Sequence, residues 1–550
     1  MKRLTSVVPC IAASLLASTA ACAADLPVKA KAIEYVRICS LYGAGFFYIP
    51  GTDTCIKLGG YLRVDTTFNG GNQGQPAWNG DIGQQNRYRD YYSARSRLAL
   101  TVDTRTASEY GVVRTFMQAD MQFTTIGNNT FNPASLNTSL VNTTSSSQIG
   151  LGVLANNAQL LETPGGGYVS VESIFIQFAG FTFGKSLSAY ATPWTGFPGN
   201  INSYLIGGHD TNTGVNNIQY TAQFGNGVSA TIGLDDPVVY GRTNVYNLAA
   251  PTNTANTSFL TAAGTNTNAY AGVHAPDIVG NIRVDQAWGL FQISAAAHEV
   301  NASYNSLAVS GLPTGLAGPN PFGPSEPSGH PGTKWGGSVM AALQIKNLPT
   351  GAGDDIKFDA SYAVGDTRNV IATSAATPNF VMFGGTSRPG AYQSTGFGVS
   401  TDAVFLPVVA GGTGDLKLTE AWGIRGAFNH TWNANWSSSL FGSYSSVHYR
   451  GAVGDLSTAK GAYCAAYLAG KAVSADFVCN PDFNASQLGV ITRWVPVKNL
   501  TFSAELMWFH LDQKFSGAAT LAATAPKPTT VYEFRDQDAI SLQLRAQRNF

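Results

Sequence analysis

The sequence predicts an all-β protein, a transmembrane antiparallel β-barrel of about sixteen strands with long extracellular loops. Three observations support this prediction. The last eleven residues alternate apolar and polar side chains and end on an aromatic residue, Phe550. Only 12% of the 550 residues are charged, and no apolar run beyond the amino terminus is long enough for a membrane-spanning helix. The candidate strands are joined by connections that alternate between long and short.

The amino terminus has the three regions of a secretory signal peptide, over residues 1–23. A basic start precedes an apolar run from Val7 to Ala17, and small residues follow up to Ala23. We therefore expect cleavage after Ala23 and export through the periplasm. An alternative interpretation makes Cys22 a lipidation site, but Thr19 stands where such sites usually have Leu.

The rest of the chain has no charge run or Pro-rich hinge that would divide it into domains. We expect one barrel domain over residues 24–550, in which 24–55 form a short segment before the barrel at 56–550. The 33 basic and 33 acidic residues balance, so bulk charge does not favour nucleic acid as a partner. The seven histidines lack metal-ligand spacing, and we expect no metal and no other cofactor.

Four cysteines follow the signal peptide and form two local pairs, Cys39 with Cys55 and Cys464 with Cys479. An exported protein meets an oxidising compartment, so this spacing predicts two local disulfide bonds. Each would close a loop of about fifteen residues and contribute on the order of 3 kcal/mol of stability. The alternative is that all four are free, buried thiols.

Alternating or aromatic-rich runs define the candidate strands. The sixteen candidates are 56–68, 91–104, 109–123, 166–178, 180–188, 215–224, 227–235, 277–286, 288–300, 334–347, 354–365, 420–431, 434–448, 487–497, 499–511 and 534–550. The eight long connections are 69–90, 124–165, 189–214, 236–276, 301–333, 366–419, 449–486 and 512–533. Seven short turns make the other connections. An even strand number puts both chain ends on the short-turn rim, which is periplasmic in bacterial outer-membrane barrels.

Side chains on these strands divide between a face for lipid and a face for water, because successive side chains on a strand point to opposite sides. In the first strand Leu58, Leu62 and Val64 share the lipid face, opposite Arg63 and Asp65. The candidates for the aromatic girdles at the membrane surfaces are Trp288, Trp335, Trp422, Trp494 and Trp508. The strand at 487–497 is ambiguous, since either phase turns an apolar residue inward, and the orientation of Arg493 stays open.

The third long connection, Ala189 to Gly214, is rich in Gly, Pro and aromatic residues, which suits a compact loop folded inside a barrel. We expect it to narrow the pore. On the wall facing it, Arg95, Arg97 and Arg114 occupy the inward phase of neighbouring strands. The predicted pore-lining residues are Arg63, Asp65, Arg95, Arg97, Asp103, Arg114, Asp120, Lys185 and Asp210.

Two interpretations of these arginines are open. They can line the narrowest passage and set a transverse field that biases ion passage. They can also simply pair with Asp65, Asp103 and Asp120 across neighbouring strands, and the two interpretations are compatible. Basic residues outnumber acidic ones in this patch, which favours anion passage unless the long loops reverse it.

Several blocks of sequence carry a resemblance to one family. They are YGAGFFYIPGTDTCIKLGGYLR at 42–63, PDIVGNIRVDQAWG at 276–289, CNPDFNASQLGVITRWVPVKNLTF at 479–502, and the terminal Phe550. Together they resemble the alphaproteobacterial general porins. The resemblance implies a homotrimer of sixteen-stranded barrels in the outer membrane, with the third loop folded into each pore and passive diffusion of small hydrophilic solutes. It also implies contact with outer-membrane lipid and lipopolysaccharide, and Phe550 resembles the signal read by the barrel-assembly machinery. The loops at 124–165 and 366–419 depart from the family, so solute size limit and ion preference do not carry over.

Two other function classes compete. An outer-membrane hydrolase would need a catalytic motif, and neither Gly-x-Ser-x-Gly nor His-Glu-x-x-His occurs. A substrate-specific channel for a sugar or an anion, or an adhesin, would use the long loops to bind its ligand. Saturable block of conductance by one solute would distinguish a specific channel from a general porin.

Overall fold

The computed structural model describes residues 37–70, 85, 91–124, 168–194, 199–200, 205–209, 213–239, 241–248, 268–305, 326–371, 380–469, 471–521 and 527–550. The predicted signal peptide and Asp210 lie outside these residues. No helix in the described part of the chain is long and apolar enough to cross a bilayer.

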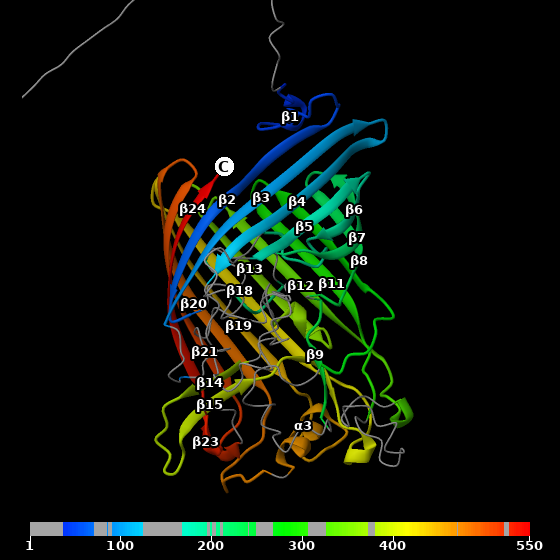
Figure 1. Ribbon diagram of the computed structural model, residues 1–550, viewed down its shortest axis with the longest axis vertical. Helices are drawn as coiled ribbons and strands as arrows, with labels where there is room; N and C mark the ends of the chain where they lie inside the picture. Colours follow the sequence, from blue (N-terminus) through cyan, green and yellow to red (C-terminus); the bar gives the residue numbers. More distant parts are fainter. Residues whose placement is uncertain are drawn as a thin grey trace, which may run out of the picture.

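Sixteen antiparallel strands form a closed barrel (Figure 1). They are β2 (Cys55–Phe68), β3 (Tyr92–Ser108), β4 (Gly111–Thr124), β5 (Tyr168–Phe178), β6 (Phe181–Ser186), β7 (Val215–Gly225), β8 (Val228–Asp235), β10 (Asp277–Gln286), β11 (Gly289–Val300), β12 (Lys334–Lys346), β13 (Asp355–Val364), β18 (Glu420–Thr431), β19 (Trp436–His448), β20 (Phe483–Val497), β21 (Leu500–Gln513) and β24 (Gln537–Asn549). Each pairs with the next, and β24 pairs with β2 to close the ring. The predicted fold class is confirmed.

Each predicted strand overlaps one barrel strand, and the ends differ by at most four residues. The two faces also agree with the sequence. Leu58, Leu62 and Val64 are 53%, 52% and 42% exposed on the outer wall, whereas Asp65 is fully buried on the inner wall. The five girdle tryptophans are all exposed, as expected for side chains that meet lipid. The loop elements β14, β15, β23 and α3 lie at one end of the barrel and the carboxy terminus lies at the other (Figure 1).

The described segment before the barrel, residues 37–54, lies at the short-turn end. It contains η1 (Ser40–Tyr42) and β1 (Phe47–Tyr48), which pairs with β2. A disulfide joins Cys39 to Cys55, the first residue of β2. Two cations, Lys57 and Arg105, lie over the ring of Phe46 at 5.9 and 4.9 Å. Cation–π contacts and the disulfide therefore attach this segment to the barrel rim.

The long loops form structure that the sequence analysis did not predict. Strands of the sixth and eighth loops make a four-stranded sheet: β14 (Phe380–Gly384), β15 (Gln393–Gly398), β22 (Ala518–Leu521) and β23 (Thr530–Phe534). Strands of the fourth and sixth loops make a three-stranded sheet: β9 (Asn244–Asn247), β16 (Thr401–Phe405) and β17 (Lys417–Leu418). The helical elements in the described parts of the loops are η5 (Glu326–Ser328), η6 (Thr367–Asn369), η7 (Val408–Ala410) and α3 (Ala459–Leu468).

An aromatic core joins the sixth loop to the inner wall. Phe380 of β14 stacks on Phe509 of β21 at a centroid distance of 5.3 Å and meets Phe483 of β20 edge-on at 5.7 Å. All three rings are fully buried. Burial of an aromatic side chain contributes about 1.5–3 kcal/mol, so the core stabilises the loop where it turns back into the barrel mouth.

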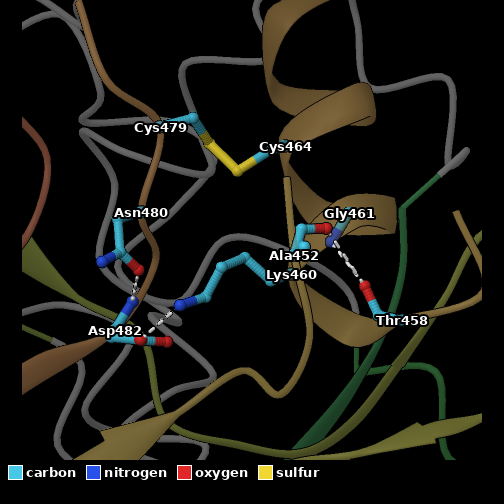
Figure 2. The surroundings of a disulfide bond; sticks show 8 residues. All are labelled: Ala452, Thr458, Lys460, Gly461, Cys464, Cys479, Asn480 and Asp482. Atoms are coloured by element: carbon cyan, nitrogen blue, oxygen red, sulfur yellow. Dashed lines mark hydrogen bonds and ion pairs between the residues drawn. A yellow bond between two sulfur atoms is a disulfide. The ribbon is translucent and has the colours of Figure 1, made fainter. Parts of the chain in front are cut away.

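The seventh loop is held by the second disulfide, Cys464 to Cys479, which confirms the other predicted pair (Figure 2). Thr458 caps α3 by accepting a hydrogen bond from the Gly461 amide at 3.1 Å. Lys460 on the same helix donates to Asp482 at 2.6 Å. Burial opposes ionisation of Asp482, but hydrogen bonds from His448 and Lys460 outweigh it and hold its pKa below the usual range.

We expect the double variant Cys464→Ser/Cys479→Ser to loosen this loop while the barrel stays closed, because the bridge lies outside the strand ladder. The lost constraint is worth about 3 kcal/mol for a loop of this length. Limited proteolysis of folded protein should then cut within residues 449–486. The variant Cys39→Ser/Cys55→Ser serves as the control and should leave that loop resistant. Loss of the folded barrel band on unheated gels in the first variant would contradict the prediction.

Candidate pore constriction

The third long loop leaves β6 after Ser186, enters the barrel and returns to the wall at Val215. Its two ends are fastened to β5. The amide of Gly214 donates to the carbonyl of Glu172 at 2.9 Å. The ammonium group of Lys185 donates to that same carbonyl at 2.9 Å and to the hydroxyl of Thr213 at 2.6 Å. Lys185 therefore holds the base of the loop.

The first half of the loop lies on the wall of β10 and β11. Asn281 donates to the carbonyl of Ala189 at 2.5 Å, and Gln292 donates to the carbonyl of Ala191 at 2.7 Å. Tyr190 between them is fully buried. Buried backbone carbonyls need hydrogen-bond partners, and here inward side chains of the barrel supply them.

The second half of the loop reaches across to β20, β21 and β24. Gln487 accepts a hydrogen bond from the Ile206 amide at 2.8 Å. Ser503 donates to the side chain of Asn200 at 2.5 Å, and the carboxylate of Glu505 accepts the Asn200 amide. The described parts of the loop thus follow the inner wall from β10 and β11 to β20, β21 and β24.

Arg425 of β18 contacts the loop at two backbone carbonyls. Its guanidinium group donates to the carbonyl of Leu205 at 3.2 Å and to that of His209 at 3.1 Å. Asp359 of β13 holds the same guanidinium at 3.0 Å, and the two side chains are 4% and 0% exposed. A Cβ at Gly208 would lie 2.7 Å from atoms of both charged groups, so any other residue there would displace the ion pair.

The predicted arginines do face the interior, and each pairs with a predicted aspartate. Arg95 contacts Asp65 at 2.5 Å, Arg97 contacts Asp120 at 2.7 Å, and Arg114 contacts Asp103 at 3.1 Å. The cross-strand pairing interpretation is therefore confirmed. Whether these side chains also line the narrowest passage stays a prediction.

The structure separates the arginines into two groups along the barrel. In the register of β3 and β4, Arg97 lies opposite Gln122, and Arg114 lies opposite Arg105. Eight residues of strand separate the two positions, or about 27 Å at the antiparallel rise. Arg114 thus belongs to a cluster near the short-turn end, while Arg95 and Arg97 lie close to the level of the third loop. The three arginines therefore lie at two different levels of the barrel.

Three further arginines were missed by the sequence analysis as site residues. Arg545 of β24 donates to Asp65 at 2.5 Å, and its place on the polar face of the last strand was a usable signal. Arg493 of β20 points inward, where it donates to Ser439 at 2.8 Å. Arg425 lies in the inward phase of β18, alternating with the exposed Trp422 and Ile424, but its contacts had no local signal, because its partners are Asp359 and a loop more than 200 residues away.

In the described part of the chain no group of three or more His, Cys, Asp or Glu side chains could hold a metal ion. Asp210, the acid expected on the third loop, lies outside the described residues. Lys185 pairs in register with Ile174, which is 52% exposed on the outer wall. The pore-lining roles of Asp210 and Lys185 stay predictions.

Comparison with known proteins identifies the family. A family model for the porin subfamily matches residues 25–543. Porin Omp2b of Brucella suis biovar 1 (strain 1330) and Porin Omp2b of Brucella abortus (strain 2308) are each 30% identical over 288 residues, which cover 50% of this chain. The chain spans only 61% of the length of these curated relatives. The crystal structure of the outer membrane channel DcaP of Acinetobacter baumannii has the same fold, with a TM-score of 0.51 and 13% identity over 92% of this chain and 99% of that one. The chain belongs to the porin subfamily, whose members are β-barrels of the bacterial outer membrane.

Proposed function

We propose that the protein is an outer-membrane porin that forms a water-filled channel for passive diffusion of small hydrophilic solutes and ions. The observation that carries this proposal is the closed sixteen-stranded barrel whose inner wall holds charged residues and a folded loop. A barrel of this size encloses a lumen too wide for its own side chains to fill. Water and solutes occupy the remaining space between the third loop and the wall of β2, β3 and β4.

The charges on that wall give the channel its selectivity. Arg95 and Arg97 are 7% and 12% exposed, so they lie in a partly desolvated setting where their fields are screened less than at a surface. Their partners Asp65 and Asp120 are fully buried behind them. Solutes that pass between this wall and the third loop are therefore oriented by fixed charges, as in other channels lined by charged side chains.

The functional unit in this proposal is a homotrimer. The short strand β6 supports this assembly. The six residues of β6 rise about 20 Å, or roughly 15 Å across the bilayer at a tilt near 45°. The apolar band of an outer-membrane barrel is about 25 Å tall, so β6 is too short to span it. The outward side chains there are exposed and apolar: Ile174, Ile176, Phe181, Phe183, Ile218 and Tyr220. A neighbouring subunit would cover this face.

The other proposed partners are the barrel-assembly machinery, outer-membrane lipid and lipopolysaccharide. The carboxy-terminal Phe550 exchanges two backbone hydrogen bonds with Gly60, at 3.1 and 3.3 Å, and so completes the seam between β24 and β2. A terminal strand of this kind suits recognition by the barrel-assembly machinery. Outer-membrane lipid and lipopolysaccharide would contact the apolar outer wall and the rim of the long loops.

We propose no enzymatic activity. The buried His298 has the local setting of a catalytic imidazole, since its two ring nitrogens meet Asp277 at 2.6 Å and the hydroxyl of Tyr270 at 2.9 Å. That hydroxyl donates to Asp402 of the sixth loop at 2.9 Å. The imidazole thus connects β10 and β11 to the fourth and sixth loops, and a structural role accounts for it.

Reconstitution in planar bilayers tests the proposal. Purified protein should give ohmic current steps in neutral salt, because water and ions fill the lumen. Flux of uncharged sugars of increasing size should rise in proportion to concentration up to a size limit. Heat-denatured protein is the control. A folded protein that gave no conductance steps would refute the porin function.

A further inference from the structure

The sixth long loop contacts the third loop directly. Its first described part, residues 366–371, contains η6 and is here called the η6 segment. The carbonyl of Val370 accepts a hydrogen bond from the amide of Gly207 in the third loop at 2.8 Å. The ring of His209 donates from Nδ1 to the amide oxygen of Asn369 at 2.7 Å. Two consecutive residues of the sixth loop therefore hold the stretch from Gly207 to His209.

The contact between the two loops is buried. Thr367, Val370 and Ile371 are fully buried, and Asn369 is 7% exposed. Gly207 on the other side of the contact is buried as well. Buried backbone groups need hydrogen-bond partners, and here the Gly207 amide and the Val370 carbonyl supply one another. Moving the loops apart would leave both groups unpaired until water entered, so the docked position is favoured.

The same stretch of the third loop also lies against the barrel wall at β18. A Cβ at the inward Gly423 would lie 2.5 Å from the Cα of Gly207, so the two backbones meet without side chains between them. Arg425 donates to the carbonyl of His209 at 3.1 Å. The third loop thus contacts both a rigid strand and the η6 segment, and its position depends on how firmly that segment is itself held.

The η6 segment is anchored to the inner wall at β12. Ser338 of that strand donates to the carboxylate of Asp366 at 2.6 Å. The amide group of Asn369 donates to the same carboxylate at 2.9 Å and to the hydroxyl of Ser338 at 2.8 Å. Asn369 therefore uses its amide nitrogen to hold its own segment to the wall and its amide oxygen to hold the third loop.

A second anchor joins the η6 segment to the rest of the loops. The fully buried carboxylate of Asp402, in β16 of the sixth loop, accepts from the amide of Thr367 at 2.7 Å and from its hydroxyl at 3.1 Å. Asp402 also accepts from the Thr243 amide and from the Tyr270 hydroxyl, each at 2.9 Å. The fourth and sixth loops therefore support the η6 segment together.

The sixth loop, at 366–419, is one of the two loops in which the chain departs from the porins that it resembles. Asn369 and His209 are 160 positions apart and meet only in the folded protein. A third loop that is held by the sixth is therefore not implied by the resemblance and follows only from the structure.

We propose that the sixth loop is a second component of the pore constriction, in which Asn369 is a positioning residue for the third loop. The proposal rests on the proposed channel function and adds to it the contact that sets the size limit for solutes. Asn369 and Val370 hold His209 and Gly207 in the docked position. When this contact breaks, the third loop moves away from that position and the passage becomes wider.

Single-channel recording of Asn369→Ala tests the proposal, together with sugar flux into liposomes. The substitution removes the acceptor of the His209 ring, and loss of one hydrogen bond changes the ratio of displaced to docked loop by about fivefold. We expect the time spent in a higher-conductance level to rise by that factor. The flux of raffinose relative to glucose should rise as well. A folded variant with wild-type dwell times and a wild-type flux ratio would overturn the proposal.

His209→Phe breaks the same contact from the side of the third loop. It removes the ring nitrogens and keeps an aromatic ring against Tyr190, whose ring centroid lies 5.6 Å away. This variant should show the same rise in dwell time, and Asn369→Ala/His209→Phe should show no more than either single variant. Effects that multiplied in the double variant would show that the two residues act independently, against the proposal.

Thr401→Val is the matched control. Thr401 is fully buried in β16 of the same loop, and its hydroxyl contacts that of Thr419 at 2.8 Å. Its removal should leave dwell times and sugar flux unchanged, and a change equal to that in Asn369→Ala would overturn the assignment to the contact with the third loop. Wild-type channels that conduct normally beside an unaltered Asn369→Ala variant would refute this proposal alone, whereas a wild-type protein without any conductance would refute the porin function.

Discussion

Replacing Arg425 with alanine should release the third loop from the barrel wall and raise the open-channel noise of single-channel recordings. The substitution removes the donor to two loop carbonyls, Leu205 and His209. It also leaves Asp359 buried without its partner, which costs about 3–5 kcal/mol for a buried ion pair broken on one side. The folded barrel should therefore also melt at a lower temperature.

A second substitution separates the two effects. In Arg425→Ala/Asp359→Ala no buried charge is left alone, so the barrel should regain most of its thermal stability. The loop carbonyls still lack their donor, so the excess noise should persist. Recovery of quiet channels in the double variant would mean that Arg425 acts only on barrel stability and does not position the loop.

The double variant Arg95→Ala/Arg97→Ala should shift ion selectivity strongly towards cations. It removes two positive charges near the level of the third loop and leaves the carboxylates of Asp65 and Asp120 in place. A change of one kT in the lumen potential alters the ratio of cation to anion permeability by about sevenfold, and two charges in a partly desolvated pore suffice for such a change. Reversal potentials in a salt gradient measure it.

Arg114→Ala is the informative comparison for that variant. Arg114 also faces inward and pairs with Asp103, but it lies near the short-turn end, about 27 Å along the strand from the level of Arg97. Its removal should move the reversal potential much less. An equal shift in both variants would show that the narrowest passage does not lie beside Arg95 and Arg97.

The local alternation of side chains was sufficient to predict the barrel itself. Alternation with a period of two is a property of a few consecutive residues, so the strands around Leu58 and Leu542 could be assigned to faces without knowing their neighbours. Both disulfides were predictable for a similar reason, since only 16 and 15 residues separate the paired cysteines. The inward phase of Arg95, Arg97 and Arg114 followed from the same alternation.

The loops could not be predicted in this way, because their partners are distant in sequence. Strand β15 of the sixth loop pairs in parallel with β23 of the eighth, and no local pattern encodes a parallel pairing across more than 100 residues. Arg493 sits in a strand with apolar residues in both phases, so only the packing of β20 between β19 and β21 turned it inward.

The sequence by itself thus determined the closed barrel, the two faces of its wall, the sorting of long and short connections and the two local disulfides. Each of these depends on neighbouring residues and on the requirement that lipid meets apolar side chains. Only the tertiary structure decided which wall receives the third loop, which carboxylate pairs with each arginine, and that Arg95 and Arg545 meet Asp65 from opposite sides. Those outcomes depend on strand register and on contacts between residues such as Asn200 and Glu505, which are 305 positions apart and meet only when the ring of strands closes.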